Sequence, residues 1–117
     1  MWAYHGTLIK NLESIIIGGL KPRVTGDKLL WGTKPVIFYS LDPKDGAQYS
    51  LFTGILLRFK QPRDGERPFK DSPFHITYTS IPPEELEVFI GGRPTRARLA
   101  ELLDNKNWAD IRNYKGD

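Results

Sequence analysis

Residues 4–23 read YHGTLIKNLESIIIGGLKPR, the most informative stretch of the sequence. Residues 2–5 predict a short strand that ends at the pair His5-Gly6. Leucine and isoleucine residues then recur at helical spacing, which predicts a helix over about residues 8–17. A strand end, a His-Gly pair and a helix in such close succession present a backbone and an imidazole to a polar ligand.

Both ends of the predicted helix carry residues suited to capping. Thr7 or Asn11 can cap its start through a side-chain oxygen. Gly18 or Gly19 can adopt the left-handed conformation that closes its end. We expect Leu20 to pack back onto the helix.

Beyond this stretch, short apolar segments alternate with turns. Strands are predicted over residues 36–40, 54–60, 74–79 and 86–90. The other predicted elements are a turn or helix from Asp42-Pro43, an exposed loop at 61–73, a rigid proline turn at 81–85 and a helix at 94–104. Short strands with two or three helices among them indicate an α+β class, and we expect one domain over residues 1–117.

Three patterns predict how these elements pack. Within residues 54–60 the odd-numbered apolar residues face one side, and the even-numbered residues, Arg58 among them, face the other. Leu99, Leu102 and Leu103 are expected to lie on one face of the helix at 94–104. Trp108 and Ile111 are expected to dock the C-terminal segment.

The composition excludes several kinds of functional site and bears on the cellular location of the protein. Without cysteine, the chain has no disulfides, thiolate metal sites or thiolate nucleophiles. Only two histidines are present, His5 and His75, which argues against an imidazole-rich metal cage. Neither a signal peptide nor a membrane span is predicted, so we expect a cytoplasmic protein that binds no membrane. The formal net charge of +3 permits anionic ligands without requiring them.

The opening segment resembles the start of proteins with the ADP-ribosyltransferase fold, which include poly(ADP-ribose) polymerase catalytic domains and RNA 2′-phosphotransferases. The resemblance implies an ADP-ribosyltransferase-like split β-sheet with a few short helices, and NAD as co-substrate. It implies that His5 holds the adenosine ribose hydroxyl and that the Gly6 backbone pairs with the nicotinamide carboxamide, with Tyr4 and Thr7 beside them. Arg23 either meets a pyrophosphate, which a guanidinium matches well, or is a plain surface arginine.

A second segment, IFYSLD at 37–42 followed by GAQY at 46–49, looks like the family's aromatic strand and the helix after it. The resemblance implies an aromatic residue beneath the nicotinamide ring and a tyrosine stacked on its other side. The cofactor-binding residues implied here are Phe38, Tyr39, Ser40, Ala47 and Tyr49. Which of Phe38 and Tyr39 faces the cleft depends on the strand register, and either can be a core residue.

A third segment, TYTSIPPEEL at 77–86, is similar to a late segment of many small family members. In active transferases a glutamate shortly before this turn stabilises the oxocarbenium-like charge that forms as the glycosidic bond breaks. This chain has no acid between Asp71 and Glu84, and His75 can occupy the position of that glutamate. The candidate catalytic residues are therefore His5, Tyr39, His75, Glu84 and Glu85.

Together these segments predict a monomeric, NAD-dependent ADP-ribosyltransferase that expels nicotinamide and passes ADP-ribose to an unknown protein, nucleic-acid or nucleotide acceptor. An RNA 2′-phosphotransferase is an alternative within the same fold, although the Arg-His-x-His strand of those enzymes is missing. A second alternative is a binding module that holds NAD, ADP-ribose or an RNA end without chemistry. A third is a small interaction protein that uses a basic face.

Overall fold

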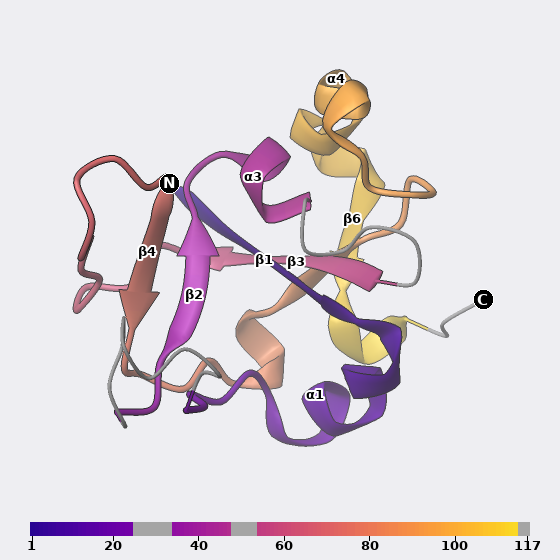
Figure 1. The fold of residues 1–117 in the computed structure, drawn as a ribbon. Coiled ribbons are helices and arrows are strands. Elements are labelled where there is room, and N and C mark those ends of the chain that lie inside the picture. Colours follow the sequence, from indigo (N-terminus) through magenta and orange to yellow (C-terminus); the bar gives the residue numbers. More distant parts are fainter. Residues whose placement is uncertain (25–33, 48–53, 115–117) are drawn as a thin grey trace.

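Six antiparallel strands form one open sheet in the computed structural model of the chain, which describes residues 1–24, 34–47 and 54–114 (Figure 1). The strands are β1 (Trp2–Leu8), β2 (Ile37–Ser40), β3 (Gly54–Lys60), β4 (Phe74–Thr77), β5 (Glu87–Phe89) and β6 (Trp108–Asp110). Their order across the sheet is β4-β2-β1-β3-β5-β6. Because short helices accompany this sheet, the predicted α+β class is confirmed.

The helices are short. The α-helices are α1 (Leu12–Gly18), α3 (Pro43–Ala47) and α4 (Leu99–Leu103), and the 3-10 helices are Ile9–Asn11, Pro83–Glu85, Arg96–Arg98, Asn105–Asn107 and Ile111–Asn113. The helices predicted over 8–17 and 94–104 thus each begin with a 3-10 turn. No helix within the three described segments combines the length and the hydropathy that a membrane span requires.

Alternation along β3 divides the core into two clusters of buried residues. The odd-numbered residues of β3 pack with Ile15 of α1, whereas Leu56 packs with Ala47 of α3 and Leu102 of α4. Neighbouring residues of a strand point to opposite faces, so the two clusters lie on opposite sides of the sheet. Full burial of one such large apolar side chain contributes roughly 1.5–3 kcal/mol to folding. This alternation is the one that the sequence predicts.

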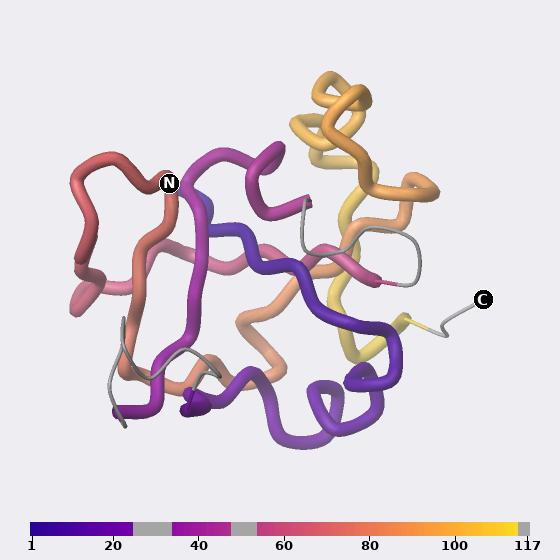
Figure 2. The backbone as a smooth tube through the Cα atoms, viewed as in Figure 1, coloured from indigo at the N-terminus to yellow at the C-terminus, as the bar shows by residue number. Residues whose placement is uncertain are grey.

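Gly19 ends α1 with a φ of 81°, as the capping pattern predicts. The next residue, Leu20, is buried in the same cluster as Ile15. Its backbone N–H donates to the carbonyl of Ile81 at 2.8 Å, and the Ile81 N–H donates back at 2.9 Å. Figure 2 shows the backbone after α1 passing close to this later segment. The opening stretch and the proline turn, which are about 60 residues apart in sequence, are therefore joined.

The C-terminal part of the chain only partly matches its prediction. Trp108 and Ile111 are buried as expected, but Trp108 also begins strand β6 and pairs with Phe89. In α4 only Leu102 is fully buried, whereas Leu103 is 56% exposed. Of the leucines predicted to share one helix face, Leu102 therefore contributes most to the core.

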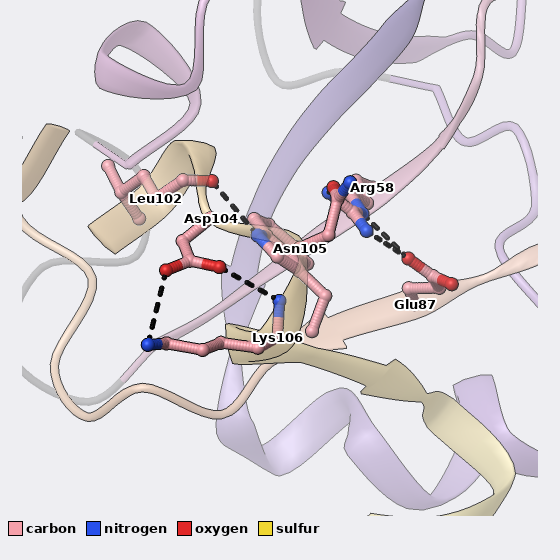
Figure 3. A network of polar contacts seen from close by, with 7 residues as sticks. Arg58, Glu87, Leu102, Asp104, Asn105 and Lys106 are labelled. Atoms are coloured by element: carbon pink, nitrogen blue, oxygen red, sulfur yellow. Dashed lines mark hydrogen bonds and ion pairs between the residues drawn. The ribbon is translucent and has the colours of Figure 1, made fainter. Parts of the chain in front are cut away.

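A buried arginine, Arg58, packs against the cluster that contains Leu56, and Figure 3 shows its side chain directed toward Glu87. Arg58 is 4% exposed, and its guanidinium lies 4.1 Å from the ring centroid of Trp2 and 4.6 Å from that of Trp108. Its Nε donates to Glu87 Oε1 at 2.7 Å, and its Nη1 donates to Asn105 Oδ1 at 3.1 Å. One side chain thus ties β1, β3, β5 and the C-terminal segment together.

Candidate ligand-binding site

The sheet separates between β1 and β2. These strands share the single paired position Tyr4–Ser40. Beyond it β1 continues to Leu8 along β3, while β2 stays paired with β4. In Figure 1, β1 starts near the tip of β2 and runs away from it. A pocket of about 270 Å³ lies where the strands part, and its walls come from β1, α1, residues 19–24 and residues 36–38.

His5 lies in this pocket with a defined protonation state. Its Nδ1 is 2.5 Å from the carbonyl oxygen of Phe38, across the gap between the two strands. A carbonyl only accepts, so Nδ1 carries the proton. Burial lowers the pKa of His5, the Phe38 hydrogen bond opposes this, and the nearby Arg23 lowers the pKa further. The imidazole is therefore neutral near pH 7, and Nε2 is left as an acceptor for a ligand hydroxyl.

We expect the free energy of unfolding to decrease as the pH is lowered through about 6.5. The pKa values of His5 and His75 are both lowered in the folded state. When the pH falls below 6.5, these histidines take up protons in the unfolded chain before they do so in the folded protein. The folded protein therefore loses stability until the pH reaches the pKa values of the histidines in the folded state. Urea unfolding between pH 7.5 and pH 5 measures this loss. The His5→Gln variant should lose less stability over that range, and an identical loss would contradict the burial of a neutral imidazole.

Beyond His5 the pocket wall combines apolar side chains with a few polar and basic ones. Thr7 Oγ1 accepts a hydrogen bond from Asn11 Nδ2 at 3.0 Å. Arg23 is exposed at the rim, and its backbone is paired with Val36 at 3.0 and 2.9 Å. Lys21 also lines the pocket, whereas no Asp or Glu among the described residues does so. The charge of the described walls is thus positive, which suits an anionic ligand.

The structure places three of the residues assigned by resemblance away from this pocket. Tyr4 points to the opposite face of β1 from His5, and its ring lies 5.8 Å from that of Trp108. Ala47 is fully buried in that same cluster. Ser40 is buried and accepts a hydrogen bond from the N–H of Asp42 at 3.0 Å, in the turn that leads into α3. Alternation of side chains along β1 and β2 accounts for the positions of Tyr4 and Ser40.

Tyr39 does not line the pocket either. It is 1% exposed, and its ring packs edge-on against Phe59 at 6.1 Å and stacks on His75 of β4 at 5.4 Å. Phe38 does line the pocket, so of the two aromatic residues it is Phe38 that faces this pocket. Tyr49 lies outside the described residues.

The acidic candidates of the proline turn also lie apart from the pocket. Glu84 and Glu85 are exposed in the 3-10 helix that follows Ile81. Glu84 lies near enough to Arg112 to help raise the pKa of that guanidinium. Glu84 therefore lies toward the C-terminal segment, and neither glutamate lines the pocket. Gly6 is closer, since it lies in β1 between His5 and Thr7, which both line the pocket.

One polar residue that the sequence did not single out is Asp64. Its carboxylate accepts hydrogen bonds from the hydroxyls of Thr77 and Thr79, at 2.5 and 2.9 Å, and from the N–H of Tyr78 at 3.1 Å. These bonds, led by that of Thr77, lower the pKa of Asp64. No sequence signal marks this cluster, because the contact joins a charged loop to a strand more than ten residues away.

Comparison of the chain with known protein families, curated proteins and solved structures finds no match. The chemistry of the pocket therefore has to be argued from its own residues. A neutral imidazole acceptor, the glycine next to it in β1 and two nearby cations can bind a ligand that carries both hydroxyls and phosphates.

Proposed function

We propose that this protein is an ADP-ribosyltransferase-like protein that binds NAD in the His5 pocket. It releases nicotinamide and passes ADP-ribose to a protein, nucleic-acid or nucleotide acceptor. The observation that carries the proposal is the position of His5. A neutral imidazole bridges the point where the sheet splits, with Arg23 in the same pocket. A strand-borne His-Gly is also what the resemblance to this fold implies, and we propose that the divergence of β1 and β2 corresponds to the split sheet of that fold.

The binding step uses groups that are already in position. A ribose hydroxyl donates to Nε2 of His5, because Nδ1 is occupied by the carbonyl of Phe38. Lys21 and Arg23 pair with the pyrophosphate, and such charge-assisted hydrogen bonds are about twice as strong as neutral ones. The lack of a side chain at Gly6 allows a planar carboxamide to approach the backbone of β1.

The chemical step breaks the bond between the nicotinamide nitrogen and the ribose carbon. Nicotinamide leaves as a neutral molecule with the electron pair of that bond, and the positive charge passes to the ribose. The acceptor then donates an electron pair to the ribose carbon and loses a proton. Fixed negative charge close to the ribose would stabilise this charge.

A second candidate function is binding of NAD or ADP-ribose without turnover. One observation favours it, namely that no carboxylate among the described residues lines the pocket. On this alternative the protein recognises the nucleotide and leaves its glycosidic bond intact.

Calorimetric titration with NAD tests the binding that both functions share. We expect the His5→Ala variant to bind NAD about tenfold more weakly than the wild type, since a buried hydrogen bond to the ribose is lost. His5→Gln should retain part of the affinity because an amide also donates and accepts. The exposed Arg96→Ala variant is the control and should bind like the wild type.

Two results would contradict the proposal. The first is no heat and no thermal shift at millimolar NAD. The second is equal affinity of the wild type and His5→Ala. Mass spectrometry of released nicotinamide then separates the two functions, because only a transferase consumes NAD.

A further inference from the structure

A second pocket, of about 680 Å³, lies where the start of β1 meets the end of β3. We call it the Trp2 pocket, and its lining residues are Met1, Trp2, Lys60, Gln61, Pro62 and Arg63. Trp2 and Lys60 are paired across the two strands, and the N–H of Gln61 donates to the carbonyl of Met1 at 3.0 Å. None of these residues lines the His5 pocket.

The Trp2 pocket and the His5 pocket are separate sites on different faces of β1. Trp2 and Tyr4 are two residues apart in one strand and pack with the same buried cluster, so their side chains share a face. His5 points to the other face. A ligand in the Trp2 pocket therefore does not compete for the contacts of the proposed NAD site.

The indole of Trp2 is anchored on one side and accessible on another. Trp2 is partly buried, and the guanidinium of Arg58 lies 4.1 Å from its ring centroid. Arg58 is itself fixed by its ion pair with Glu87 at 2.6 Å. A cation over an indole is attracted by the ring, so this contact holds Trp2 in place. Since Trp2 also lines the pocket, it presents a rigid aromatic surface there.

The polar part of the Trp2 pocket is cationic. Lys60 and Arg63 are exposed, and neither forms an ion pair with any residue that the structure describes. No Asp or Glu of the described segments lines this pocket. The acid that follows Arg63 is engaged elsewhere, because Asp64 accepts three hydrogen bonds from residues 77–79. The two cations are thus available to an anionic ligand.

An aromatic surface beside two cations matches the chemistry of an unpaired nucleotide strand. Single strands bind proteins through bases that stack on aromatic side chains and phosphates that meet basic ones. The amide of Gln61 adds a donor and an acceptor for the edge of a base. Four of the six lining residues are exposed, so a continuous strand can cross the pocket without being enclosed.

We propose that the Trp2 pocket binds single-stranded nucleic acid. One base stacks on the indole of Trp2, and the neighbouring phosphates pair with Lys60 and Arg63. Every base has a π face, so this site selects unpaired strands with little preference for their sequence. The inference goes beyond the proposed function and does not depend on it, because the two pockets share no residue.

Two apolar replacements of Trp2 test the stacking contact. Fluorescence anisotropy of a labelled single strand of about ten thymidines measures binding. We expect Trp2→Leu to bind about tenfold more weakly, because it keeps an apolar side chain against the core but offers no ring. Trp2→Phe should lose less affinity, since its ring still stacks. Equal affinity of Trp2→Leu and the wild type overturns the proposal, and so does equal loss in Trp2→Leu and Trp2→Phe.

Three exposed cations test the phosphate contacts without altering the core. We expect Lys60→Ala and Arg63→Ala each to lower the slope of log affinity against log salt concentration by about 0.7, the value for one lost phosphate contact with a single strand. Lys70→Ala removes the same charge from the 61–73 loop outside the pocket and should keep the wild-type slope. Equal slopes of Lys60→Ala, Arg63→Ala and Lys70→Ala overturn the assignment.

The same strand annealed to its complement is the final control. Its bases are stacked within the duplex and are not available to Trp2, so we expect weaker binding than that of the single strand. Equal or tighter binding of the duplex overturns the proposal, as does the absence of any anisotropy change with the wild-type protein. Either result leaves the proposed binding of NAD to be judged by its own titration.

Discussion

Replacing Arg58 with alanine is expected to lower the free energy of unfolding by about 3 kcal/mol, since removal of one partner from a buried ion pair costs about 3–5 kcal/mol. The cost falls at the lower end because Glu87 is 35% exposed and regains water when its partner is lost. The loss has a second source, the gap left between the rings of Trp2 and Trp108. Equilibrium unfolding in urea measures the change.

A surface ion pair of the same length provides the control. Arg112 and Asp110 are joined at 2.6 Å, as Arg58 and Glu87 are, but the Arg112 side chain is 54% exposed. We expect Arg112→Ala to cost less than about 1 kcal/mol. Arg58→Lys keeps the charge but loses the planar stacking and the fork of donors, so it should remain clearly destabilised. Wild-type stability in Arg58→Lys would show that charge alone explains the site.

The fold class could be predicted because local patterns and the final fold agree. Alternation in β3 predicts the two core clusters, and the pair Gly18-Gly19 predicts the end of α1, which Gly19 caps. Elements fixed by distant contacts were harder to predict. Strand β6 exists because Trp108 pairs with Phe89, and three residues alone carry no period that marks a strand.

The sequence predicts only those pocket residues that lie close together along the chain. His5 and Thr7 share a face of one strand, and the helix after them returns Arg23 to the same pocket. Tyr39 was assigned to a ligand wall, but β2 turns it toward the core. The surroundings of the residues near position 75 could not be predicted from the sequence. They depend on how the 61–73 loop folds back onto β4, where Asp64 contacts Thr77.

The Gly19→Ala variant is expected to lose about 3 kcal/mol of stability, because two independent costs meet at one position. The backbone at Gly19 has φ 81° and ψ −171°, a region that is essentially restricted to glycine. A Cβ atom there would also lie 2.2 Å from the carbonyl oxygen of Ile81, a backbone atom that no rotamer change can move aside. Urea unfolding gives the loss of stability, and calorimetry should show weaker NAD binding because Gly19 and Leu20 line the pocket.

Gly18 provides the control for Gly19→Ala, because Gly18→Ala adds the same methyl group without the strained backbone or the contact with Ile81. At Gly18 a Cβ atom would meet only the flexible end of Lys21, at 3.5 Å, and the residue belongs to α1. Gly18→Ala should therefore be neutral or stabilising by up to about 1 kcal/mol. Hydrogen exchange locates the damage in Gly19→Ala, since the amides of Leu20 and Ile81 bond each other's carbonyls and should lose protection first. Equal stability of Gly18→Ala and Gly19→Ala would mean that the proline turn moves to make room for the added methyl group. The pairing of Leu20 with Ile81 would then not determine the shape of the pocket.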